Sequence, residues 1–243
     1  MEILEIQKVD LTSFCYLNKD RYPFLLESVN HNENNRYSIL FAFPGENIVL
    51  NEFSDFDFLK ELQDKSKSTI LDSDLPFIGG WFIYLSYELI GQIEPTLVSK
   101  LHKSKLPIAY AVEIPSAIIV DHKIDKTFII DQDNNHSRIN SILSDIKLFK
   151  KMPTQRIKAC QSEEVENKFI DGVKSSLDYI VAGDVFQVNL SRKWQYLLTE
   201  STNSTLIYNA LKKANPAPFS ALIQYQNFSI ISSSPERLFS VND

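Results

Sequence analysis

The sequence predicts an α+β protein with long, mostly antiparallel strands. Three observations lead to this class. Apolar runs of strand length recur along the chain, amphipathic segments with helical spacing lie between some of them, and short polar turns join others directly. With 243 residues, 44% of them hydrophobic, the chain has enough apolar material for one large domain or two small ones.

The first half of the chain reads mainly as strands. The predicted strands are 24–26, 37–43, 48–50, 79–88, 107–120 and 127–130. The polar turn 121–126 predicts a hairpin between the last two of them. One helix is predicted to begin at Ser54 or Asp55 and to run to Lys65, and a second covers 137–150.

A polar, proline-containing stretch at 151–160 is the predicted linker between a region 1–150 and a region 161–243. Beyond it, Ser162 is predicted to cap a helix that Gly183 ends. The apolar residues of this helix are Val165, Phe169, Val173, Leu177 and Ile180. A strand at 186–198, a helix ended by Asn215-Pro216, and a hairpin of 219–225 with 228–232 complete the prediction.

Composition excludes several classes of function. A net charge of −6 and a sequence pI of about 5.3 argue against a nucleic-acid binder, although local cations still allow an anionic substrate. No glycine motif for nucleotide phosphates is present, and the two cysteines, Cys15 and Cys160, form no zinc or redox motif. Without a signal peptide or a long apolar stretch, the expectation is a cytoplasmic protein with no membrane partner.

Two rigid segments are candidates for chemistry. Residues 215–220 place two prolines before an aromatic ring and a hydroxyl, and residues 232–237 place a Ser-Pro turn before Glu236 and Arg237. A carboxyl on stiff backbone beside a guanidinium suits proton transfer or dicarboxylate binding. The alternative is a polar strand end with a surface ion pair. Glu88 and Asp184 are further acids beside apolar strands, with the same two interpretations.

Five segments in order resemble component I of the chorismate-using synthases, which includes aminodeoxychorismate (para-aminobenzoate) synthase and anthranilate synthase. The segments are 24–28, 79–88, 183–191, 215–221 and 234–237. The resemblance implies two layers of β-sheet with flanking helices, as in anthranilate synthase component I. Residues 188–191, residues 218–220 and Arg237 resemble the aminodeoxychorismate branch more than the anthranilate branch.

The resemblance also implies an activity. Members of the aminodeoxychorismate branch aminate Mg²⁺-bound chorismate at C4 with ammonia from a glutamine amidotransferase subunit, on the route to folate. Glu236 falls on the catalytic glutamate of the family. Ser28, Arg36, Tyr37, Pro218, Phe219 and Ser220 fall on its tryptophan pocket. The metal ligands of the family and its nucleophilic lysine do not fall within these residues. We therefore expect a truncated chain that is inactive by itself.

Other interpretations remain open from the sequence. The first is anthranilate synthase component I, which uses the same substrate. A second, of a different class, is a module without catalysis that binds tryptophan or docks the amidotransferase. A decayed remnant without function is the last.

Overall fold

The computed structural model describes residues 1–30, 35–66, 73–101, 105–148, 152–153, 155, 157–163, 166–198 and 202–240. The chain forms two compact units. The first joins Met1–Pro153 with Ser204–Asp243, and the second is Thr154–Asn203. Positions 151, 154 and 156 of the predicted linker, and Val165 of the predicted helix, lie outside the described residues.

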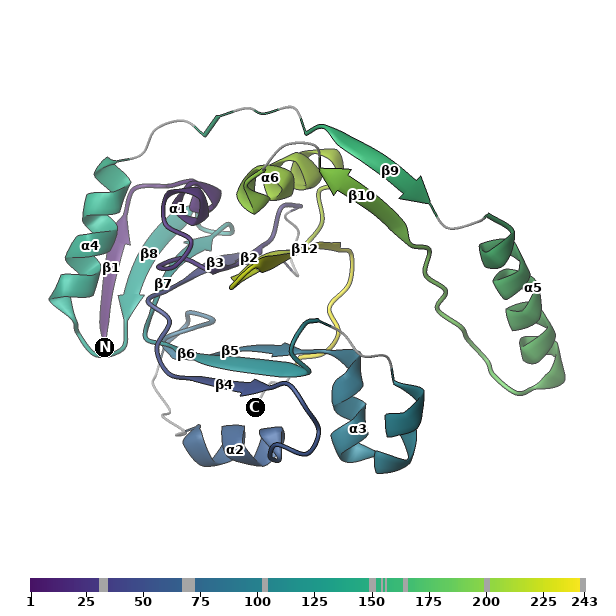
Figure 1. The fold of residues 1–243 in the computed structure, drawn as a ribbon. Helices are drawn as coiled ribbons and strands as arrows, with labels where there is room; N and C mark the ends of the chain where they lie inside the picture. Colours follow the sequence, from purple (N-terminus) through teal and green to yellow (C-terminus); the bar gives the residue numbers. More distant parts are fainter. Residues whose placement is uncertain are drawn as a thin grey trace. The chain divides into compact units, whose positions relative to one another are not determined.

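A seven-stranded sheet is the centre of the first unit (Figure 1). Its strands are β1 (Glu2–Ile6), β2 (Phe24–Glu27), β3 (Tyr37–Ala42), β7 (Ser116–Asp121), β8 (Lys126–Asp131), β11 (Phe219–Tyr225) and β12 (Phe228–Ser234). They lie in the order β1-β8-β7-β3-β2-β11-β12, and every neighbouring pair is antiparallel. The predicted hairpins β7-β8 and β11-β12 are therefore neighbours in one sheet.

A second sheet of three strands lies in the order β4-β6-β5. Its strands are β4 (Asn47–Leu50), β5 (Gly80–Leu85) and β6 (Ala109–Ile114). The single strand predicted over 107–120 is wrong, because the chain leaves β6 at Pro115 and enters β7 in the other sheet. Proline has no N–H to donate to a ladder, and its carbonyl instead accepts a hydrogen bond of 2.9 Å from the backbone N–H of Gln132.

The two sheets pack face to face through aromatic side chains. Phe24 of β2 stacks on Phe82 of β5 with ring centroids 4.1 Å apart and planes 2° apart. Phe41 of β3 meets the same ring edge-on, and Tyr110 of β6 completes the cluster. These side chains are buried. The predicted two-layer α+β architecture is confirmed.

Helices cover the outer faces of both sheets (Figure 1). Three of them pack on the seven-stranded sheet, namely α1 (Leu11–Leu17), α4 (His136–Lys147) and α6 (Ser204–Ala214). The three-stranded sheet is covered by α2 (Phe58–Lys65), whose N-cap is Asp57 rather than the predicted Ser54 or Asp55. The Asp57 carboxylate accepts a hydrogen bond from Lys60 N. Ser54 and Asp55 lie too many residues before Lys60 for their side chains to cap the helix in this way.

A short helical segment follows β5 where the sequence predicted strand up to residue 88. It consists of a 3-10 turn η1 (Tyr87–Leu89), α3 (Ile90–Ile93) and a second 3-10 turn η2 (Pro95–Lys100). Gly91 is buried in it, and a Cβ at this glycine would lie 2.7 Å from the ring of Phe53. The glycine therefore allows the segment to approach the loop that follows β4.

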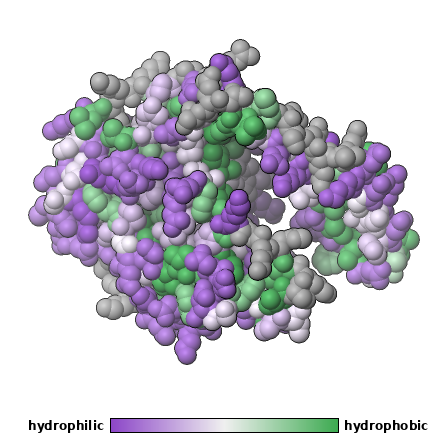
Figure 2. All heavy atoms as spheres, viewed as in Figure 1, coloured by the Kyte–Doolittle hydropathy of each residue, from purple (hydrophilic) through white to green (hydrophobic). Residues whose placement is uncertain are grey.

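The second unit contains β9 (Ala159–Glu163), α5 (Glu166–Ala182) and β10 (Trp194–Leu198). The strand predicted over 186–198 is confined to β10, which pairs with β9. Gly183, with φ of +83°, ends α5 as predicted. Many large apolar side chains of this unit are exposed (Figure 2). They include Leu177, Tyr179, Val181, Phe186, Trp194, Tyr196 and Leu197.

The compact units differ from the regions predicted by sequence. Helix α6 and the hairpin β11-β12 follow the second unit along the chain but belong to the first unit, because β11 pairs with β2. This pairing brings two distant candidate segments into one sheet.

Candidate functional site

The residues predicted for a tryptophan pocket come together at one end of three neighbouring strands. Ser28 follows β2, Tyr37 begins β3, and Ser220 lies in β11 opposite Glu27 of β2. The backbone N–H of Val29 donates a hydrogen bond of 3.1 Å to the carbonyl of Ala217, just before Pro218. The sheet topology thus joins two sequence segments that are almost two hundred residues apart.

The serines of this cluster are buried and already hydrogen-bonded. Ser28 Oγ donates to the carbonyl of Tyr37 at 2.9 Å, and Ser28 N donates to Ser38 Oγ at 3.0 Å. Ser220 Oγ donates to the carbonyl of Ala217 at 3.2 Å. Their present contacts hold β2, β3 and the start of β11 in register.

Arg36 is engaged inside the protein. Its guanidinium donates to both carboxylate oxygens of Asp121 at 2.6–3.0 Å and lies 4.7 Å from the centre of the Tyr37 ring. Asp121 is buried at the end of β7. Burial alone would raise the pKa of Asp121, but the hydrogen bonds from Arg36 and from backbone N–H groups lower it below its ordinary value. A ligand carboxylate at Arg36 would share the guanidinium with Asp121.

Sequence reasoning missed three members of this cluster. Asp121 was interpreted only as part of a polar turn, and Ser38 and His122 were not singled out. Ser38 Oγ lies 2.7 Å from Nε2 of His122. The only available signal was polar residues at the ends of two strands that the sequence could not show to be neighbours.

The last two predicted pocket residues lie at the entry to β11. Pro218 and Phe219 are partly buried, and the guanidinium of Arg237 lies 5.3 Å from the centre of the Phe219 ring. Arg237, which follows β12, therefore contacts the start of β11 at the same open end of the hairpin, where Phe219 pairs with Ser234. This contact links the 218–220 segment to the 234–237 segment.

Glu236 lies just after β12, in the bend that Pro235 begins. Ser234 Oγ donates a hydrogen bond of 3.0 Å to the backbone carbonyl of Glu236. The residue is exposed. Within the part of the chain that the structure describes, no layer covers this side chain.

The other two candidate acids have different surroundings. Asp184 is exposed in the turn after α5, where its backbone N–H donates to the carbonyl of Tyr179. Glu88 is half-buried in η1 and lines a cavity of about 440 Å³ together with Ser86 and Glu52. Glu88 thus lies at a cavity of ligand size.

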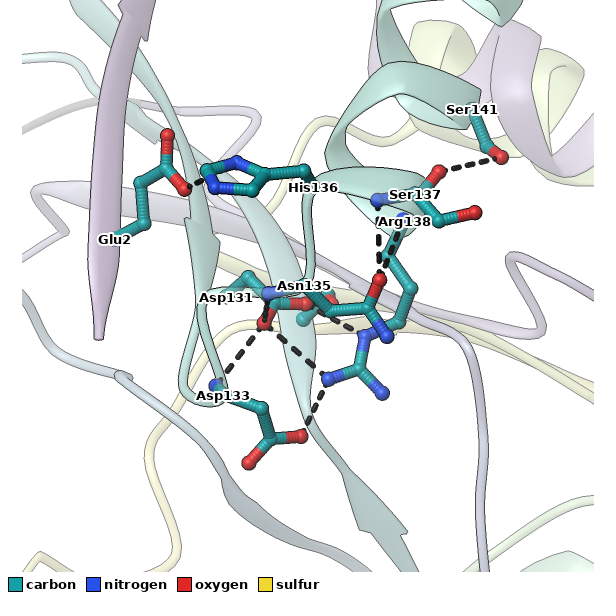
Figure 3. Close-up of polar contacts among 9 residues, drawn as sticks. Glu2, Asp131, Asp133, Asn135, His136, Ser137, Arg138 and Ser141 are labelled. Carbon is teal, nitrogen blue, oxygen red and sulfur yellow. Dashed lines mark hydrogen bonds and ion pairs between the residues drawn. The ribbon is translucent and has the colours of Figure 1, made fainter.

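A separate polar cluster surrounds the start of α4 (Figure 3). Asp131, fully buried at the end of β8, accepts hydrogen bonds from Arg138 Nε at 2.7 Å, from Asn135 N at 2.8 Å and from Ser116 Oγ. Asn135 caps α4 through its side-chain oxygen. Because each of these groups satisfies another within the fold, the cluster anchors α4 to the sheet and is not a binding site.

In the ranges that the structure describes, no group of three or more His, Cys, Asp or Glu side chains is placed to hold a metal ion. Among the described helices, none is long and apolar enough to cross a membrane.

Several known proteins resemble this chain in fold or in sequence. The anthranilate synthase component I of Streptococcus pneumoniae has a similar fold, with a TM-score of 0.68 at 22% identity over 88% of this chain and 53% of that one. The anthranilate synthase component 1 of Lactococcus lactis is 26% identical over 92% of this chain and 54% of its own length. The aminodeoxychorismate synthase component 1 of Bacillus subtilis is 29% identical over 72% and 40%.

The chain thus spans about half, or less, of the length of these relatives. Residues 18–243 match the family described as chorismate binding enzyme, which covers nearly the whole chain and both compact units. The resemblance carried by the five sequence segments is confirmed at this level, and the chain belongs to the chorismate-binding enzyme family.

Proposed function

We propose that the protein containing this chain is component I of an aminodeoxychorismate synthase. The family match over residues 18–243 is the observation that carries the proposal, and the Bacillus subtilis relative of that name supports it. The reaction joins ammonia to C4 of chorismate and releases the C4 hydroxyl as water, giving 4-amino-4-deoxychorismate. The ammonia would come from a glutamine amidotransferase subunit, and the product would serve folate synthesis in the cytoplasm.

Glu236 is the proposed general acid and base of this reaction. Hydroxide is a poor leaving group, so a proton must reach the departing oxygen. A neutral carboxyl in a site that is closed to water meets this need. Because Glu236 is exposed in the described part of the chain, the proposal requires further polypeptide to cover it. We therefore expect the 243-residue chain alone to give no product.

We also propose that the protein uses Mg²⁺, binds tryptophan and receives ammonia from a partner subunit. The described residues contain no group of three or more His, Cys, Asp or Glu side chains placed to hold the metal ion. Tryptophan would lie against Pro218 and Phe219, with its carboxylate near Arg36 and its amine near Ser28. Calorimetry and thermal unfolding with added tryptophan test this pocket. The absence of both a binding heat and a thermal shift would contradict it.

The second candidate is anthranilate synthase component I. It is favoured by the Lactococcus lactis relative, whose match extends over 92% of this chain, whereas the aminodeoxychorismate relative covers 72%. Both candidates use chorismate and differ in the carbon that is aminated. The 188–191, 218–220 and Arg237 positions lead us to place the aminodeoxychorismate activity first.

Product analysis separates the two. The protein containing this chain is incubated with chorismate, an ammonium salt and Mg²⁺, with and without an aminodeoxychorismate lyase. A product that becomes para-aminobenzoate only with the lyase supports the first proposal, and fluorescent anthranilate without the lyase overturns it in favour of the second. Glu236→Gln should abolish turnover, whereas the exposed Glu94→Gln should not. Full activity of Glu236→Gln would refute the assigned role.

A further inference from the structure

A cavity of about 440 Å³ lies among three segments of the first unit. Its walls are the loop 51–54 after β4, the turn 86–88 after β5, and residues at the end of η2 and before β6. We propose that this cavity binds a small organic cation, a protonated primary amine carried on an apolar body. The volume lies within the range of about 300–1,000 Å³ that is usual for small-molecule sites.

Charge determines the class of ligand. Two acidic residues, Glu52 and Glu88, line the cavity, and the polar residues Asn51 and Ser54 line it as well. None of the described lining residues is basic. An ammonium group has three donors and finds acceptors on these side chains, whereas a ligand carboxylate meets two like charges. A dicarboxylate has the wrong charge for this cavity.

Ser86 provides an independent observation. It occupies the N-cap position of η1, where serine ordinarily accepts a hydrogen bond from a backbone N–H, yet its side chain caps nothing. Its Oγ is buried and has no hydrogen-bond partner among the described residues. The backbone is held in place, since Ser86 N donates to the carbonyl of Ile108, another lining residue, at 2.9 Å. A buried hydroxyl without a partner at a cavity wall suits a ligand that supplies one.

The remaining wall of the cavity is apolar, and Gly91 packs against two of its side chains. Phe53, Leu101 and Ile108 line it. A Cβ at Gly91 would lie 2.7 Å from the Phe53 ring and 3.0 Å from Leu101 Cδ1, so alanine at this position must displace one of them. Glycine at 91 thus preserves the shape of the wall. An aromatic or branched aliphatic body fits against these side chains while the amine reaches the carboxylates.

The test uses the 243-residue chain and three probes of nearly equal size. These are 2-phenylethylamine, which is cationic at neutral pH, 2-phenylethanol, which is neutral, and 3-phenylpropanoate, which is anionic. Binding is followed by amide chemical shifts of the ¹⁵N-labelled chain. We expect 2-phenylethylamine at millimolar concentration to shift the amide signals of residues 51–54 and 86–88. It should bind at least about tenfold more tightly than 2-phenylethanol, and 3-phenylpropanoate should not bind.

Three variants test which lining residues determine binding. Glu88→Gln keeps the shape and removes one charge, so it should weaken the amine about tenfold and leave the alcohol unchanged. Glu94→Gln removes an exposed carboxylate beside η2 that does not line the cavity, and it should bind like the parent chain. Gly91→Ala should weaken all binding. Absent binding of 2-phenylethylamine, equal binding of amine and alcohol, or an unchanged affinity in Glu88→Gln would each overturn the proposal.

Discussion

Replacing Arg138 by methionine removes the charged partner of a carboxylate that is fully buried. The Asp131 side chain is 0% exposed, and Arg138 donates to both of its oxygens, at 2.7 and 3.2 Å. Breaking a buried ion pair from one side costs about 3–5 kcal/mol. Three other donors stay on Asp131, from Ser116, Asp133 and Asn135, so we expect the lower end, about 3 kcal/mol.

The loss should depend on pH in one direction. Burial would raise the pKa of Asp131, but the hydrogen bonds from Arg138 and Ser116 lower it below its ordinary value. A carboxyl whose folded-state pKa is depressed adds stability above its unfolded pKa, about 3.9, and loses that contribution as pH falls through the folded-state pKa. The difference between the parent chain and Arg138→Met should therefore be largest at neutral pH and shrink below about pH 4.

Thermal and urea unfolding measure this difference. For a unit of roughly 150–250 residues, about 3 kcal/mol corresponds to a fall in Tm of about 6–12 °C. Lys126→Met is the matched control, because Lys126 pairs with Glu5 at 2.8 Å on the surface, where such pairs contribute about 0–1 kcal/mol. An equal loss in both variants, or a loss in Arg138→Met that does not change between neutral and acid pH, would refute the reasoning.

Three further predictions concern stability and reactivity. Gly79→Ala should cost about 1–3 kcal/mol in urea unfolding, because φ is +124° and a Cβ would lie 2.0 Å from the side-chain oxygen of Gln132; an unchanged midpoint contradicts it. Phe82→Ala should cost about 3–5 kcal/mol, since its buried ring joins the two sheets, and a loss below 1 kcal/mol would exclude that role. A thiol reagent should modify Cys160, which is exposed, and spare Cys15, because burial raises the pKa of that thiol; two reactive thiols in the native chain would disprove this.

Local patterns predicted several of the strands and the helix α5. The runs around β2, β3, β8 and β11 have strand length and β-branched or aromatic residues, and the 4, 4, 4, 3 spacing before Gly183 identified α5. The strand β1 and helix α1 were not predicted. Both are short, and their stability comes from packing on β8 and on the core rather than from their own residues.

The candidate site was predicted in composition but not in its contacts. Family resemblance named Ser28, Arg36 and Ser220, and the structure places Ser28 just after β2 and Ser220 in the adjacent strand β11. No motif could show that Asp121 already pairs with Arg36, or that Glu236 is exposed in the described part of the chain. Hydrogen-bond partners across a sheet depend on strand order, which local residue types do not encode.

The sequence by itself determined the α+β class, the turn and helix-end positions at glycines and prolines, and the family to which the chain belongs. Only the tertiary structure decided that Pro115 divides one apolar run between two sheets and that β11 returns to pair with β2 after an intervening unit. The physical reason is the distance along the chain over which each kind of interaction acts. Periodicity and turn chemistry act between neighbours in the chain, whereas sheet pairing and burial are decided by contacts between distant residues.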